Sequence, residues 1–169
     1  ENWKQQSATM NVVSRPFYFS CLVIDPNDPK RVYRPGFGFS YSTDGGYSFT
    51  DASDAGGWVH SDHHALWINP NNTNELYLGT DGGVYNSLDK GATWRFFGNL
   101  PVGQFYHVQY DNKTPYNIYG GLQDNGSWVA PSQSYGGVDN GDWRDIYFGD
   151  GFWTLPDPFD PNIAYAEYQ

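Results

Sequence analysis

The chain has 169 residues, enough for a domain with its own core, and its formal net charge is −10 at pH 7. Only 9 lysines and arginines are present, so the sequence lacks the basic footprint of nucleic-acid binding and we expect no nucleic-acid partner. No apolar run reaches the roughly 18 residues of a membrane-spanning helix, and the single cysteine excludes an internal disulfide.

Short aromatic and β-branched runs alternate with Gly, Pro, Asn and Asp throughout the sequence. Aromatic residues make up 19 % of the chain, which also contains 20 glycines and 11 prolines. No stretch of ten or more residues has the apolar spacing of an amphipathic helix. The pattern predicts an all-β protein with few helices.

A repeat of about 44 residues runs along the chain. Its clearest copies begin with an apolar pair, Asp or Asn and a polar turn, as in VIDPNDPKRVY (23–33) and WINPNNTNELY (67–77). The strand tyrosines recur at spacings of 44, 42 and 46, at Tyr33, Tyr77, Tyr119 and Tyr165. A period of this length holding several short strands is typical of a β-propeller blade.

We therefore expect 1–169 to form a single partial propeller segment of about three and a half four-stranded blades, part of a longer protein. The expected blades lie near 17–60, 61–104, 105–150 and 151–169. Because the third copy degenerates after GLQDNGSW, segment 130–150 is expected to be a loop-rich insertion between blades. The other blades of the same propeller, or a second propeller, are expected as partners.

Two blades also carry the pattern S-x-D-x-G-x-x-(W/F). It consists of Ser42, Asp44, Gly46 and Phe49, and again of Ser87, Asp89, Gly91 and Trp94. In such a turn the Asp accepts backbone N–H groups, Gly takes the positive-φ position, and the aromatic ring packs between blades. The pattern resembles the Asp-box, or BNR, hairpin of sialidase-like and sortilin-like propellers, where it marks the fold and not an active site.

Several strings, among them PGFGFSYSTDGG, VHSDHHALWINP and YGGLQDNGSW, together resemble large secreted bacterial BNR-repeat proteins of the sortilin-N-terminal-like and xyloglucanase-like group. The resemblance implies a secreted, periplasmic or cell-surface location. It also implies one of two functions: binding of peptides, or hydrolysis of polysaccharide by paired aspartates in a cleft between two propellers.

The stretch HSDHH (60–64) holds three of the four histidines. On a strand, His60, Asp62 and His64 would share one face, opposite Ser61 and His63. Such a set can bind a transition metal, contact a ligand, or form a structural polar network in the innermost blade strand. All three interpretations stay open; we assign no metal and no cofactor, and retain His60, Asp62 and His64 as ligand-binding candidates.

Asp81, in GTDGGVY, loosely matches a TDVGGAY-like string of xyloglucanase-type enzymes. The resemblance implies a catalytic acid or base, whereas a TDGG sequence by itself equally favours an Asx-type turn. A sialidase is disfavoured because the five arginines do not form a motif for a substrate carboxylate: Arg15, Arg31, Arg34, Arg95 and Arg144.

Aromatic side chains beside Gly, Asn and Asp are the remaining ligand candidates: Trp58, Trp128, Trp143, Phe152 and Trp153. Their faces suit sugar rings, and Gln123, Asp124 and Asn125 can supply polar contacts. Packing between blades is the alternative use of these rings. We expect an extracellular recognition or scaffold propeller that binds glycan or peptide; a xyloglucanase-like glycoside hydrolase is the alternative, so whether the protein is an enzyme stays open.

Overall fold

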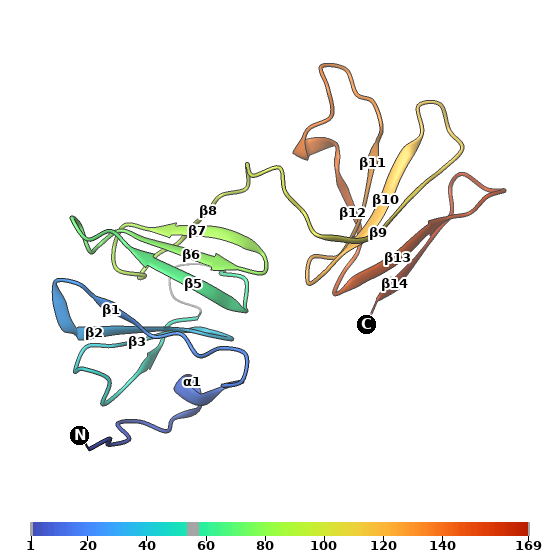
Figure 1. Cartoon of the computed structure of the whole chain (residues 1–169). Coiled ribbons are helices and arrows are strands. Elements are labelled where there is room, and N and C mark those ends of the chain that lie inside the picture. Colours follow the sequence, from blue (N-terminus) through green and yellow to red (C-terminus); the bar gives the residue numbers. More distant parts are fainter. Residues whose placement is uncertain (1, 54–57, 169) are drawn as a thin grey trace. The chain divides into compact units, whose positions relative to one another are not determined.

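The computed structural model describes residues 2–53 and 58–168, which fold into two compact units, Glu1–Gly98 and Asn99–Gln169 (Figure 1). Residues 1, 54–57 and 169 lie outside the described residues; of these, 54–57 and 169 fall within the expected blades. In the described part the helices are the single-turn α1 (Met10–Val13) and the 3-10 turn η1 (Asn140–Asp142). None of its helices is long and apolar enough to span a membrane.

The first unit contains two four-stranded antiparallel sheets, each a simple meander, with the orders β1-β2-β3-β4 and β5-β6-β7-β8. Their strands are β1 (Val23–Asp25), β2 (Asp28–Pro35), β3 (Phe39–Ser42), β4 (Thr50–Asp51), β5 (His63–Ile68), β6 (Leu76–Thr80), β7 (Gly83–Ser87) and β8 (Arg95–Phe96). A four-stranded meander is the unit of a propeller blade. The prediction of an all-β chain with blade-like sheets is confirmed.

The second unit repeats the meander in the order β9-β10-β11-β12 and adds a two-stranded sheet, β13-β14. Its strands are β9 (Phe105–Tyr110), β10 (Asn117–Leu122), β11 (Ser127–Pro131), β12 (Arg144–Tyr147), β13 (Gly151–Pro156) and β14 (Ala164–Tyr168). Segment 130–150 is loop-rich over 132–143, as expected, but it is not an insertion between blades, because β12 pairs with β11 as the fourth strand of the same sheet. Its four residues follow a long Gly- and Asp-rich loop, which hides the strand in the sequence.

The sequence repeat corresponds to a turn that recurs in each sheet. An Asp or Asn at the end of the first strand accepts the backbone N–H two residues later, in Asx turns at Asp25, Asn69, Asp111 and Asp157. The repeat tyrosine lies on the second strand, and Tyr119 and Tyr165 donate to the turn carboxylates of Asp111 and Asp157 at 3.1 and 3.0 Å. In these two sheets the turn and the second strand are thus joined by side chains as well as by the backbone hydrogen bonds, whereas Tyr77 donates to Glu75 at 3.1 Å.

The core of the first unit draws on both of its sheets. Tyr33 and Phe39 from the first sheet and Leu76 and Leu78 from the second are almost completely buried. Each such side chain contributes about 1.5–3 kcal/mol of transfer free energy. This packing holds the start of β5, with its histidines, against the first sheet.

Candidate functional site

The first Asp-box turn satisfies its own polar groups. Ser42 Oγ donates to Asp44 Oδ1 at 2.7 Å and accepts the N–H of Gly46 at 2.8 Å. Asp44 also accepts the hydroxyl and backbone N–H of Ser48, and these hydrogen bonds hold the pKa of its carboxyl well below the usual range. Gly46 has φ +90°, a region that favours glycine.

The second Asp-box turn repeats these contacts. Ser87 Oγ donates to Asp89 Oδ1 at 2.8 Å, and Asp89 accepts the Thr93 hydroxyl at 2.6 Å and the Thr93 N–H at 2.8 Å. The hydrogen bond from the Thr93 hydroxyl is the main cause that lowers the pKa of Asp89. Trp94 then meets Phe39 of the first sheet edge-to-face, with ring centroids 5.2 Å apart. Phe49, its counterpart in the first turn, is half-buried.

The HSDHH stretch is not one continuous strand. β5 begins at His63, Asp62 has φ +61°, and the register against β6 slips between His63 and Ala65. The prediction that His60, Asp62 and His64 share a strand face is therefore wrong. The cause lies in the first sheet, where the carbonyls of Phe37 and Gly36 accept the N–H groups of Asp62 and His63 at 3.1 and 2.7 Å. This pairing replaces the alternation that a regular strand would impose.

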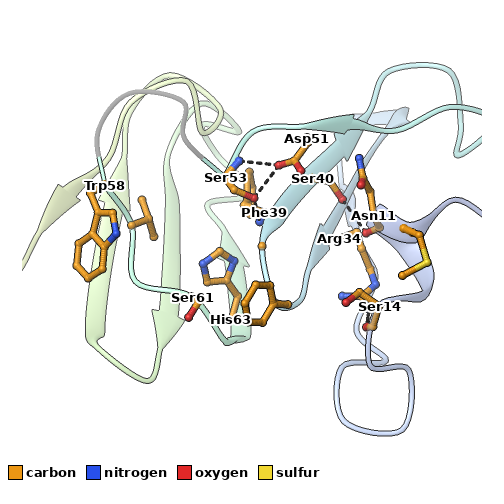
Figure 2. Close-up of a pocket in the computed structure, with 14 residues that line it drawn as sticks. Asn11, Ser14, Arg34, Phe39, Ser40, Asp51, Ser53, Trp58, Ser61 and His63 are labelled. Carbon is orange, nitrogen blue, oxygen red and sulfur yellow. Dashed lines mark hydrogen bonds between the residues drawn. The ribbon is translucent and has the colours of Figure 1, made fainter. Parts of the chain in front are cut away.

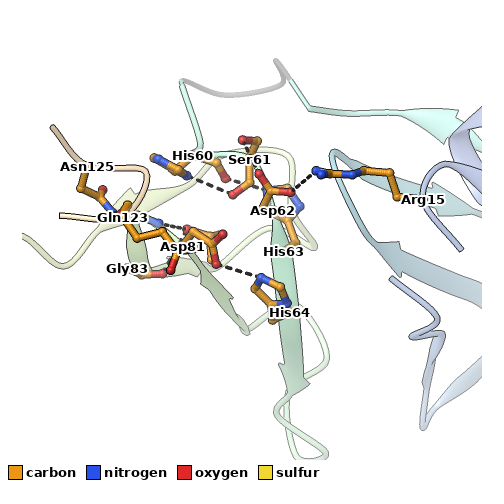
Figure 3. Close-up of polar contacts among 12 residues, drawn as sticks. Arg15, His60, Ser61, Asp62, His63, His64, Asp81, Gly83, Gln123 and Asn125 are labelled. Atoms are coloured by element: carbon orange, nitrogen blue, oxygen red, sulfur yellow. Dashed lines mark hydrogen bonds and ion pairs between the residues drawn. The ribbon is translucent and has the colours of Figure 1, made fainter. Parts of the chain in front are cut away.

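His64 and Asp81, both predicted site residues, form a side-chain pair (Figure 3). His64 Nε2 lies 2.8 Å from Asp81 Oδ1, and both side chains are partly exposed. The rings of Tyr18 and Phe19 lie 5.5 and 5.3 Å from the imidazole centroid. The carboxylate of the turn between β6 and β7 and an imidazole of β5 are thus held together beside aromatic rings.

Asp62 and His60 are held by other partners. Asp62 Oδ1 pairs with Arg15 at 3.2 Å, and its Oδ2 accepts the Ser61 hydroxyl at 3.1 Å (Figure 3). His60 Nδ1 lies 3.0 Å from the carbonyl of Ser61. The backbone N–H of Asp81 donates to the carbonyl of Asp62, so the two loops adjoin. Within 2–53 and 58–168 no group of three or more His, Cys, Asp or Glu side chains is arranged to hold a metal ion.

His63 faces away from this surface and lines a pocket of about 480 Å³ in the first unit (Figure 2). It is 2 % exposed, and burial is the main cause that lowers the pKa of its imidazole, against the opposing effect of the His60 and Gly38 carbonyls. Its Nε2 lies 2.9 Å from the His60 carbonyl. Arg34, Phe37, Phe39 and Trp58 are among the other lining residues.

The candidates of the second unit meet at the turn between β10 and β11. Asn125 donates to the Gln123 carbonyl at 2.8 Å, and the Trp128 indole donates to the Asn125 carbonyl at 2.6 Å. The N–H of Asp124, where φ is +59°, donates to Asp150 at 2.6 Å. Through these contacts the four predicted residues, Gln123, Asp124, Asn125 and Trp128, stabilise the turn itself.

The two other tryptophans of this unit pack elsewhere. The Trp143 ring lies 5.6 Å from that of Phe105, while Trp153 stacks on His107 at 3.8 Å and 8°. Phe152 stacks on Tyr106 in the same way, at 4.7 Å and 6°. The stacked pairs join β13 to β9, as expected of packing between strands of neighbouring sheets.

Sequence reasoning missed four residues around the histidines: Arg15, Tyr18, Phe19 and Arg34. The first three lie just before β1 in a stretch with no motif, and only the fold brings them to His64 and Asp62. Arg34 has a signal that can be recognised in retrospect. It is an arginine inside an apolar strand segment, where burial obliges it to find acceptors.

No family model matches this chain, and no curated protein matches it. Among solved structures it is similar to an ancestral GH74 enzyme, at 17 % identity and a TM-score of 0.45, over 88 % of this chain and 21 % of that one. It is also similar to the GH74 xyloglucanase from Xanthomonas campestris, at 16 % identity and a TM-score of 0.39, over 86 % of this chain and 26 % of that one. The chain thus spans between a fifth and about a quarter of the length of these two proteins.

Proposed function

We propose that this chain is a recognition segment of an extracellular or cell-surface propeller and that it binds glycan at the surface formed by Tyr18, His64 and Asp81. The observation that carries the proposal is the His64–Asp81 pair, held at 2.8 Å beside the 57 % exposed ring of Tyr18. Sugars present C–H faces that stack on aromatic rings and hydroxyls that donate to carboxylates.

The hydrogen-bonding chemistry of this surface favours a glycan over a peptide as the ligand. The hydroxyl groups of a sugar are donors that suit the carboxylate acceptor of Asp81. Peptide binding at the same surface is the competing outcome of the test.

A glycoside hydrolase is the second candidate function, favoured by the same contact. An imidazole at hydrogen-bond distance from a carboxylate can exchange a proton with it, which suits Asp81 to a general acid or base. The reaction also needs a second carboxylate, about 5–9.5 Å away across a cleft. If the chain is part of a hydrolase, another propeller of a longer protein supplies this second carboxylate.

The test combines binding and turnover on the same samples. Xyloglucan and cello-oligosaccharides, with a set of unrelated peptides as the comparison, are titrated against the whole chain, and the reducing ends released are counted. We expect oligosaccharide binding that is lost in Asp81→Ala and kept in Trp3→Ala, a variant of a 97 % exposed aromatic residue. Binding of peptides alone would overturn the glycan assignment, and new reducing ends that depend on Asp81 would favour the hydrolase.

A further inference from the structure

We infer that the pocket between the first sheet and the start of β5 binds a carboxylate-bearing sugar, a hexuronate, through Arg34 and His63. The inference rests on the proposed glycan recognition and adds a second subsite with its own chemistry. Arg34, His63 and the indole of Trp58 all line this pocket of about 480 Å³, within the usual range for small-molecule sites (Figure 2).

Arg34 supplies a buried positive charge. Its side chain is 3 % exposed, and burial lowers the pKa of the guanidinium. Within the described residues its hydrogen-bond partners are backbone carbonyls: Nε donates to Val12 at 3.1 Å, Nη2 to Phe19 at 2.7 Å and to Ser14 at 3.5 Å, and Nη1 to Pro35. Carbonyls satisfy hydrogen bonds but do not neutralise the charge.

The ion pairs of the described residues do not include Arg34. A guanidinium has five N–H groups, and the contacts with carbonyls account for four of them. A buried charge is normally paired, because its desolvation otherwise goes uncompensated. A carboxylate in the pocket would provide the missing counter-charge and accept the remaining N–H of Nη1.

His63, in contrast to Arg34, requires a hydrogen-bond donor from the ligand. With the pKa lowered by burial, the ring is neutral near pH 7, and Nε2 donates to the His60 carbonyl. Nδ1 is then a buried acceptor without a hydrogen-bond partner among the described residues, and the Gly38 carbonyl beside the ring cannot donate to it. A hydroxyl group of a ligand can donate to it, whereas a bare carboxylate cannot.

The walls of the pocket are partly aromatic. Trp58 is 77 % exposed and Phe37 is 51 % exposed, and both line the pocket. Asp51 also lines it, but its Oδ1 already accepts the N–H and hydroxyl of Ser53 at 2.9 and 2.7 Å. A ring with an apolar face, a carboxylate and several hydroxyls offers a partner to the Arg34 charge, to Nδ1 of His63 and to the aromatic walls, and a hexuronate has that composition.

The test varies the ligand first, so that it does not depend on a buried variant that fails to fold. NMR titrations of the whole chain compare D-glucuronate, its methyl ester, D-glucose and acetate. We expect glucuronate to bind at least about tenfold more tightly than each of the other three, because only it carries both the charge and the hydroxyls. Equal affinity for glucuronate and glucose, or for glucuronate and acetate, would overturn the inference.

A matched pair of surface variants locates the site. Trp58→Ala is expected to weaken glucuronate binding about tenfold, since it removes a stacking face, while Trp3→Ala leaves the affinity unchanged. An unchanged affinity in Trp58→Ala would place the sugar elsewhere and contradict the inference. Binding of neutral oligosaccharides that depends on Asp81, without any preference for glucuronate, would sink this inference alone; loss of all sugar binding would sink the proposed function with it.

Discussion

Asp81 and Asp89 lie in consecutive hairpin turns of one sheet, yet their carboxylates are used in different ways. Asp89, between β7 and β8, accepts hydrogen bonds from Ser87 and Thr93 of its own turn, at 2.6–2.8 Å. Asp81, between β6 and β7, pairs with His64 on β5, 17 residues earlier in the chain. One carboxylate is occupied by its own hairpin, and the other reaches a neighbouring strand.

This contrast distinguishes structural turn aspartates from those that are candidates for function. A carboxylate enclosed by its own turn has its lone pairs directed at local N–H and O–H groups and serves the hairpin. A carboxylate that contacts an imidazole on the protein surface has been positioned by tertiary structure. Substitutions at the two positions separate these two roles.

The largest effect is expected for Asp89→Ala. The substitution removes three hydrogen bonds and leaves the hydroxyl of Ser87, which is 1 % exposed, without its acceptor. We expect the free energy of unfolding to fall by about 1–3 kcal/mol in urea denaturation. Asp81→Ala is the matched control, and an equal loss in both variants would erase the contrast between the two turns.

The buried histidine gives the next largest effect. The folded pKa of His63 lies below the ordinary value of 6.5, so on acidification the unfolded chain takes up this proton first. Stability is then full above pH 6.5 and falls as the pH drops from there toward the folded pKa. Thermal melting between pH 7.5 and 5 measures the decline. His63→Gln is expected to flatten the curve, and a wild-type curve already flat over this range would contradict the assignment.

The Asp boxes lose stability in a lower pH window. The folded pKa values of Asp44 and Asp89 lie below the ordinary 3.8, so their contribution is present above that pH and is lost as the pH falls through the folded values. Both carboxylates are close to solvent, and we expect a small effect because exposed interactions are screened. Melting of Asp44→Asn and Asp89→Asn between pH 5 and 2 should show a weaker dependence on pH than the wild type.

The smallest effect on stability is expected for Asp81→Asn. The substitution keeps the shape of the turn, and the partly exposed pair with His64 contributes less than about 0.5 kcal/mol. Urea denaturation checks the stability, and oligosaccharide titration should show that binding is lost although the fold is kept. A loss above about 1 kcal/mol would instead give Asp81 a structural role like that of Asp89.

How far the sequence predicts the molecule depends on the range of each interaction. The Asp boxes are predictable because Ser42 reaches Gly46, and Asp44 reaches Ser48, within four residues of the chain. The same holds for the Asx turns, which extend over two residues. Strand β12 was not predicted, because it is defined only by its pairing with β11, from which a long loop separates it.

The histidine stretch shows the limit most directly. The alternation of side chains along a strand would place His60, Asp62 and His64 on one face. In the structure, however, the carbonyls of Gly36 and Phe37 accept the backbone N–H groups of residues 63 and 62. That contact spans about 26 residues, and no local pattern encodes it. It directs the side chain of His63 into the core and leaves the side chain of His64 at the surface, where it contacts Asp81.

The sequence alone determined the strand content, the repeat with its tyrosines and the closed Asp-box turns, because hydrophobic periodicity and turn chemistry act over a few residues. Tertiary structure alone decided that Asp81 meets His64, that Arg34 is buried among carbonyls, and that His63 lines a pocket beside it. These contacts depend on how separate strands pack and pair, and the burial they create sets the charge state and the unsatisfied groups from which a binding site is made.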